Sequence, residues 1–247
     1  SNNARDLINR WRLVKKNPDA ALSEPEQPLV YWVENSTPEE IRPFVVKGIE
    51  AWNKAFEKAG FKNAIVAKIQ PDDAEWDAGD VRYNVVRWAS TPSPRYSGYG
   101  PSVANPRTGE IIAADIVQEF NAIKRGYTYR KLWGYTEEND PLEQWIVSLT
   151  MHEVGHTLGL RHNFKSSWIY DAKEVHDVSI TGDNHIGSVM DYDPINLAPE
   201  GTPQGNFFPT GPGFYDIWAI EFGYTSSFTD EELSLIHISE PTRLDDI

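Results

Sequence analysis

The stretch HEVGHTLGLRH, residues 152–162, constrains this chain more than any other segment. Side chains four positions apart lie on one face of a helix, so His152 and His156 can reach a single metal ion. Glu153, between them, can face a water at that metal without binding the metal itself. Gly159 stands where the helix is expected to end, and a positive φ there can turn the chain so that His162 becomes a third ligand. The spacing predicts a three-histidine metal site with a carboxylate beside it.

The metal expected at such a site is Zn²⁺. Three protein ligands leave the fourth tetrahedral position open for water, which is typical of catalytic zinc sites. The chain contains no cysteine, so the ligands must be histidines or carboxylates. Five specified residues at this spacing are expected by chance roughly once in a hundred thousand chains of this size. Ca²⁺ would suit an acidic chain, but no calcium-binding motif supports it.

Strand and helix patterns alternate in the first part of the chain. Apolar runs predict strands at residues 28–33, 63–69 and 81–88. After the first strand, Thr37 as N-cap, Pro38 at the first helical position and Glu40 in a capping box predict a helix that ends before Gly60. This alternation is the beginning of an α/β unit.

A loop and a hairpin are expected next. Residues 91–100 are rich in Pro, Gly, Ser and Tyr, which predicts an exposed loop. The turn sequence at 105–109 predicts a hairpin between residues 101–104 and 110–117, and we expect one of these strands at a sheet edge.

The sequence predicts two further helices. Asp140 as N-cap and Pro141 at the first helical position predict the helix that carries the first two histidines and ends near Leu158. The sequence beyond Phe164 is loop-like, until residues 213–224 predict a last short helix.

The long motif matches the HExxHxxGxxH signature of metzincins, and SVMDY at residues 188–192 resembles their Met-turn. The resemblance implies that Met190 lies beneath the histidines as a hydrophobic base. It implies that Tyr192 binds the metal or supports an oxyanion, as in astacin-like and serralysin-like members. The implied activity is that of a zinc-dependent endopeptidase with Glu153 as general base, acting on peptide or protein substrates.

The same resemblance implies an α/β (α+β) fold. Its parts are a mixed, mostly parallel twisted sheet with an antiparallel edge strand, an active-site helix, and a smaller C-terminal subdomain across the cleft. More narrowly, the segments RWRL, AWNKAFEKAGF, NPRTGEI, SVMDY and YDIWAIEFGY resemble a bacterial family of EcxA-like metzincin domains found in large exported proteins. This implies a secreted, periplasmic or cell-surface location and a domain within a longer polypeptide. It also implies that residues 101–104 line the cleft, where a substrate peptide adds as an extra strand.

We expect three parts in the chain. Residues 1–27 form a polar arm or linker, and residues 28–232 form the catalytic domain, with an upper subdomain at about 28–162 and a lower one at about 163–232. Residues 233–247 form a tail whose first part resembles the in-frame translation of a sequencing-library adapter. On this hypothesis the native sequence ends near Glu232, and His237 is not a metal ligand. The hypothesis would be disproved if the gene in source DNA contained the codons for this adapter-like segment.

Composition argues against other classes of partner. A net charge of −14 does not suit a nucleic-acid surface, which needs clustered Lys and Arg. No run approaches the roughly 20 apolar residues that a membrane span requires.

Several alternatives stay open at this stage. We expect His176 and His185 to be exposed loop histidines. Glu174 is the one sign of a gluzincin, in which a downstream Glu replaces the third His, and Gly159 and His162 argue against it. Asp115 and Asp216 could support a site or hold a structural ion, and neither receives a catalytic role. The alternative function is a catalytically silent metzincin-fold module that binds a peptide or another domain.

Overall fold

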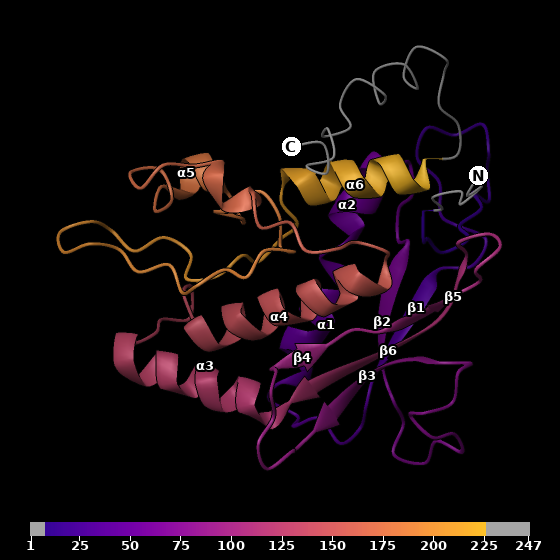
Figure 1. Ribbon diagram of the computed structural model, residues 1–247, viewed down its shortest axis with the longest axis horizontal. Helices are drawn as coiled ribbons and strands as arrows, with labels where there is room; N and C mark the ends of the chain where they lie inside the picture. Colours follow the sequence, from indigo (N-terminus) through magenta and orange to yellow (C-terminus); the bar gives the residue numbers. More distant parts are fainter. Residues whose placement is uncertain (1–7, 226–247) are drawn as a thin grey trace, which may run out of the picture.

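The computed structural model describes residues 8–225, and a mixed sheet forms their framework (Figure 1). The strand order is β2-β1-β3-β6-β4, with β5 also paired to β6. The strands are β1 (Leu29–Val33), β2 (Ile65–Ile69), β3 (Asn84–Ala89), β4 (Gly98–Tyr99), β5 (Ser102–Ala104) and β6 (Ile111–Glu119). The first three and β6 pair in parallel, whereas β4 and β5 run antiparallel to β6. The prediction of a mostly parallel sheet with an antiparallel edge is confirmed.

Helices pack against this sheet and against one another. They are α1 (Arg42–Glu50), α2 (Asn53–Lys58), α3 (Phe120–Trp133), α4 (Pro141–Thr157), α5 (Val178–Thr181) and α6 (Phe214–Tyr224), with a 3₁₀ turn at Ser166–Trp168. In Figure 1, α3 and α4 lie side by side, and both α1 and α3 contact α4. Within residues 8–225, no helix has both the length and the apolar character needed to cross a membrane.

The first predicted helix begins later than its capping signals indicate and is interrupted. α1 starts at Arg42, with no side-chain cap, and Thr37 is buried ahead of it. Pro43 explains the late start, because a proline lacks the N–H of a helix interior and its ring clashes with the carbonyl four residues earlier. It is tolerated only in the first turn, where the structure places it. A turn at residues 51–52 then separates α1 from α2.

α3 was not expected from the sequence. Gly126 and Thr128 lower the intrinsic helix propensity of this stretch, but tertiary packing stabilises it. A Cβ on Gly126 would collide with the side chain of Leu142, so the glycine allows α3 to approach α4 closely. Because residues lining one side of the cleft lie on α3, this close approach shapes the site.

α4 begins and ends as predicted and runs through the core. Asp140 accepts a hydrogen bond from the N–H of Leu142 at 3.0 Å, which confirms it as the N-cap. Along the helix, the indole of Trp52 donates to the carbonyl of Met151 at 3.1 Å, and the hydroxyl of Tyr31 lies 2.8 Å from that of Thr157. Buried hydrogen bonds of this kind fix the rotation of α4, and with it the direction in which its histidines point.

The polar N-terminal segment lies on the domain from residue 8 onward. The indole of Trp11 donates to the carbonyl of Thr157 at 2.8 Å, and Arg10 donates to the carbonyl of Gly223 at 2.7 Å. The segment thereby ties the end of α4 to α6. The boundaries at residues 27, 162 and 232 stay predictions, and the adapter-like tail with His237 lies outside the described residues.

Candidate metal centre

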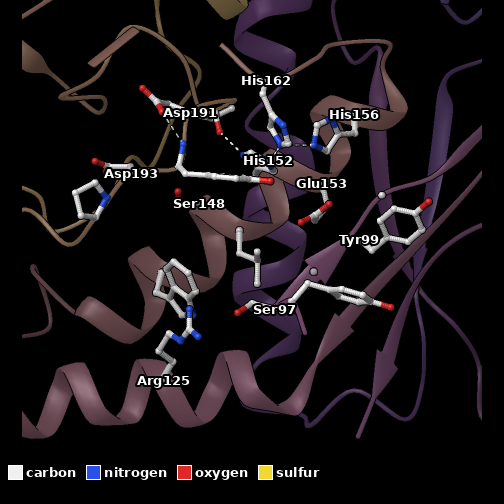
Figure 2. A pocket seen from close by; sticks show the side chains of 18 of the residues that line it. Ser97, Tyr99, Arg125, Ser148, His152, Glu153, His156, His162, Asp191 and Asp193 are labelled. Atoms are coloured by element: carbon white, nitrogen blue, oxygen red, sulfur yellow. Dashed lines mark hydrogen bonds between the residues drawn. The ribbon is translucent and has the colours of Figure 1, made fainter. Parts of the chain in front are cut away.

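Three imidazole nitrogens converge at the C-terminal end of α4 (Figure 2). Nε2 of His162 lies 3.2 Å from Nε2 of His152 and 3.2 Å from Nε2 of His156. Two nitrogens bound to one tetrahedral zinc at its usual bond length are about 3.3 Å apart. In the described part of the chain, these histidines are the only cluster of three or more His and acidic side chains with metal-binding spacing. The predicted ligands therefore fit Zn²⁺ without rearrangement.

Gly159 brings the third histidine to this point. α4 ends at Thr157, and Gly159 has a φ of 100°, which a side-chain-bearing residue rarely adopts. A Cβ on Gly159 would also collide with the backbone carbonyl of Asn9. The predicted turn is thus present, and close packing against the N-terminal segment reinforces the need for glycine.

Backbone carbonyls orient two of the imidazoles. Nδ1 of His152 lies 2.7 Å from the carbonyl oxygen of Val189, and Nδ1 of His156 lies 3.0 Å from that of Leu160. A carbonyl can only accept, so each Nδ1 carries the proton and each Nε2 presents a lone pair. Burial lowers the pKa of His152 to about 4 and also lowers that of His156, with repulsion between the histidines adding to the effect. Both rings are kept neutral, as ligation requires.

Glu153 lies beside the histidines with its side chain buried against β4 (Figure 2). Burial raises the pKa of Glu153 to about 8, and a hydrogen bond from the backbone of Gly100 opposes the rise. A Zn²⁺ ion held by the neighbouring histidines would lower this pKa, because a nearby cation favours the ionised carboxylate, which is the form that a general base needs. A Cβ on Gly98 would stand 2.6 Å from Oε1 of Glu153, so this glycine leaves room for the carboxyl group, whereas a Cβ on Gly100 would collide with the backbone of Glu153.

The edge of the cleft differs from the sequence expectation. Part of the predicted exposed loop, Gly98–Tyr99, forms β4 and pairs with Val117 and Gln118 of β6. Residues 95–101 line the cleft, so the strand beside Glu153 is β4 and not residues 102–104. Short length and two glycines hid β4, because neither an alternating pattern nor β-propensity marks it.

Met190 packs against α4, the helix that carries the first two histidines, and its role as their hydrophobic base stays a prediction. Met190 is completely buried, and a Cβ on Gly155 would collide with its sulfur atom. The turn ends at Tyr192, whose ring centroid is 4.5 Å from that of His162 and 5.6 Å from that of His152. Tyr192 is 67% exposed, so it stands at the rim, free to meet a substrate.

Asp216 holds the Met-turn, which is a supporting role of the kind that the sequence analysis left open for it. Its carboxylate accepts hydrogen bonds from the hydroxyl of Ser188 at 2.5 Å and from the N–H groups of Val189 and Gly213, each at 2.8 Å. The side chain is inaccessible to solvent, and burial raises the pKa of Asp216 to about 6. The only sequence signal was one carboxylate within the otherwise apolar residues 213–220.

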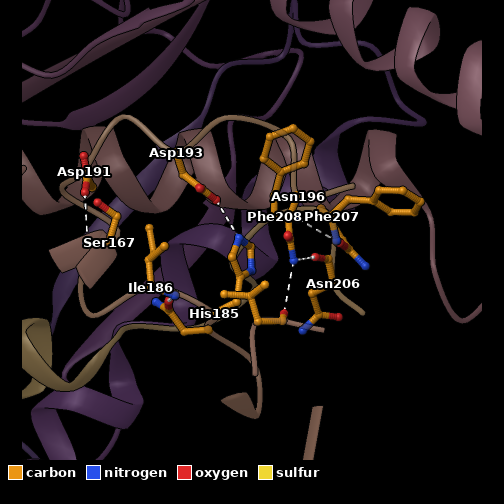
Figure 3. Close-up of polar contacts among 12 residues, drawn as sticks. Ser167, His185, Ile186, Asp191, Asp193, Asn196, Asn206, Phe207 and Phe208 are labelled. Atoms are coloured by element: carbon orange, nitrogen blue, oxygen red, sulfur yellow. Dashed lines mark hydrogen bonds and ion pairs between the residues drawn. The ribbon is translucent and has the colours of Figure 1, made fainter. Parts of the chain in front are cut away.

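The two loop histidines are buried, which corrects the expectation that they are exposed. Nε2 of His185 lies 2.8 Å from Oδ2 of Asp193, just after the Met-turn (Figure 3). His176 is buried nearby, and burial with repulsion from His185 lowers its pKa. Both histidines are covered by residues 193–208, a segment without helix or strand. A sequence pattern assigns loop histidines to the surface, because it does not show which loops fold back over them.

The remaining acidic alternatives lie away from the metal centre. Glu174 accepts a hydrogen bond from the N–H of Asp171 at 3.0 Å and is absent from the histidine cluster. Asp115 pairs with Arg87 at 3.2 Å on the sheet. The geometry of a gluzincin is therefore not present.

The cleft over these residues has a volume of about 1170 Å³. This exceeds the roughly 300–1,000 Å³ of most small-molecule pockets and suits several residues of an extended peptide. Its walls come from β4 and the loop before it, from α3 and α4, and from the segment that follows the Met-turn.

Comparison with known proteins agrees with this geometry. Residues 135–240 match the model of a family described as Met-zincin, a segment that carries α4, the three histidines, the Met-turn and α6. Among solved structures, the chain is similar to one in the GM1-bound form of the ECX AB5 holotoxin, with 14% identity over 81% of this chain and 83% of that chain and a TM-score of 0.42. A similarity of that size supports no argument here. No curated protein matches the sequence.

Proposed function

We propose that the chain is a zinc-dependent endopeptidase, because residues 135–240 match the model of the Met-zincin family. The observation that carries the proposal is the convergence of three imidazole nitrogens at spacings suited to zinc, in one cleft with the carboxyl group of Glu153. A purely structural zinc site would explain neither the carboxyl group nor the large cleft.

The reaction is hydrolysis of a peptide bond. Zn²⁺ bound by His152, His156 and His162 would supply Lewis-acid polarisation of the scissile carbonyl and lower the pKa of water toward about 7. Glu153 takes a proton from the attacking water and passes it to the leaving amine, a contribution of roughly 10²- to 10⁴-fold. Tyr192, at the rim beside His162, donates a hydrogen bond to the developing oxyanion.

The substrate lies extended along β4. Among the described strands β4 ends the sheet order, and residues 95–101 line the cleft. A peptide that adds to this edge brings its backbone past Glu153, and main-chain hydrogen bonds hold it in register. Such binding requires an unfolded or loop segment of the target, so proteins and peptides are the expected substrates.

The test is cleavage of a random peptide library by the full chain, with and without a zinc chelator. We expect cleavage that needs zinc and that is lost in Glu153→Gln, which keeps the shape of the side chain but cannot accept the proton. Zinc content of the variant, measured by elemental analysis, should equal that of the wild type. Undiminished cleavage by Glu153→Gln would disprove the mechanism.

The second candidate is a silent module that binds a peptide or a neighbouring domain through the same cleft. It predicts a zinc-loaded protein that binds library peptides and cleaves none. We prefer the enzyme because all three ligands and the base are present with suitable geometry.

We further propose that the domain works outside the cytoplasm as part of a longer polypeptide, on the basis of the family resemblance. Fractionation of the source cells with an antibody against the domain tests both points. A cytoplasmic signal at the mass of the isolated domain would contradict them.

A further inference from the structure

Exposed cationic side chains line the cleft of this acidic chain. Three arginines line it, Arg95 before β4, Arg125 on α3 and Arg161 beside the third histidine, although the net charge is −14. Within residues 8–225, no carboxylate lies within ion-pair distance of any of these three side chains. All three are exposed, so their charges are available to a ligand.

The acidic groups of the cleft, in contrast, are already occupied. Oδ2 of Asp193 lies 2.8 Å from Nε2 of His185, so this carboxyl group already has a partner within the protein. Asp191 accepts hydrogen bonds from the hydroxyl of Ser166 and from the N–H groups of Ser167 and Tyr192 (Figure 3). Glu153 serves the proposed reaction. In the described part of the chain, the three arginines therefore lack a carboxylate partner, whereas Asp191 and Asp193 already have protein partners.

Arg125 lies where it can meet a substrate side chain. It rises from α3 toward the pocket (Figure 2), and its guanidinium lies 6.0 Å from the ring centroid of Trp145. A cation–π contact at this distance uses none of the N–H donors of the guanidinium, which stay free for a carboxylate. Deeper in the same cleft the lining is apolar, with Leu149, Val189 and Ile195. The combination fits a substrate with an apolar residue in the pocket and an acidic one beside it.

We propose that this cleft selects peptides that carry an acidic side chain near the residue held in the pocket, and that Arg125 recognises the carboxylate. The inference rests on the proposed function, which identifies the ligand as a peptide. It adds to that function the class of peptide that the cleft prefers. Because Arg125 is exposed, the expected preference is about three- to tenfold, and it should weaken at high salt.

The test measures binding separately from turnover. Zinc-loaded full chain carrying Glu153→Gln is titrated with two dye-labelled pools of random peptides, one with Glu and one with Gln at the same alternate positions. We expect tighter binding of the Glu pool. Adding Arg125→Gln should remove much of the preference, whereas Arg125→Lys should retain it. Arg107→Gln is the matched control, since Arg107 lies in the 105–109 turn outside the cleft lining.

The outcomes separate this inference from the endopeptidase proposal. Equal binding of both pools, or a preference that survives Arg125→Gln, overturns the inference even when the wild type cleaves peptides. A Glu preference that depends on Arg125 supports it even when the wild type cleaves none, in which case the endopeptidase proposal fails alone. A melting temperature for Arg125→Gln equal to that of the control confirms that the fold is intact.

Discussion

The carbonyl oxygen of Val189 lies 2.7 Å from Nδ1 of His152, so the Met-turn holds the ring of a predicted metal ligand directly. The N–H of the same residue donates to the buried carboxylate of Asp216. One residue of the turn thus joins α6 to α4, and displacement of Asp216 is transmitted to the ligand. Partners of this kind raise the basicity of a ligating imidazole and set its orientation.

Asp216→Ala should weaken both the fold and zinc binding. It leaves three donors unpaired, on Ser188, Val189 and Gly213. At about 1–3 kcal/mol for each unpaired buried donor, we expect a loss of roughly 3 kcal/mol or more. Zinc affinity should fall about 10- to 100-fold, because the carbonyl that orients His152 is no longer held. Urea unfolding of the metal-free protein and competition with a chelator measure the two effects. Wild-type zinc affinity in the variant would contradict the link through Val189.

The titration of Asp216 makes the free energy of unfolding depend on pH, in a direction that its raised pKa determines. Burial raises its pKa from 3.8 to about 6 in the folded protein. The folded state therefore holds the proton more tightly, and the stability from this group is full below about pH 4 and is lost as the pH rises through 6. Asp216→Asn cannot titrate, so its stability relative to wild type should increase between pH 4 and 7, by an amount of the order of 3 kcal/mol at most. Urea unfolding of both proteins across this range, with zinc chelated, measures it; parallel curves would contradict the raised pKa.

The prediction for Gly98 concerns the space that β4 leaves for the proposed base. A Cβ there would stand 2.6 Å from Oε1 and 2.8 Å from Cγ of Glu153, so Gly98→Ala must displace the carboxyl group or the strand. We expect kcat/KM to fall by at least about tenfold, since misplacement of a catalytic group by an ångström can cost about a hundredfold. Gly223→Ala is the control, because within residues 8–225 no atom lies within 4 Å of where its Cβ would stand. Equal activities in the two variants would show that the glycine is not needed.

The sequence predicts the parts of the molecule that form through interactions between residues near one another in the chain. It does not predict the parts that depend on distant residues. The histidine motif and the ends of α4 depend on residues within one or two turns, so spacing and capping predict them. α3 depends on contact between Gly126 and Leu142, and its local propensity points the other way. Asp216 and Ser188 are 28 positions apart, and no local pattern marks their pairing. The late start of α1 was predictable, since Pro43 signals it, but the stronger-looking cap at Thr37 points to the wrong residue.

Gly159→Ala should separate the conformational cost of the turn from its effect on the metal centre. Gly159 and Gly182 both have positive φ, 100° and 61°, but among the described residues a Cβ would meet a neighbour at Gly159 and none at Gly182. Either substitution should cost about 1–3 kcal/mol, because a residue with a Cβ rarely adopts a backbone of positive φ. In Gly159→Ala, the collision with Asn9 must also shift the chain that carries His162, so zinc affinity should fall as well. Gly182→Ala should keep wild-type affinity. Chelator competition and thermal unfolding on both variants decide the matter: equal zinc affinity in the two would mean that the turn at Gly159 does not position the third ligand.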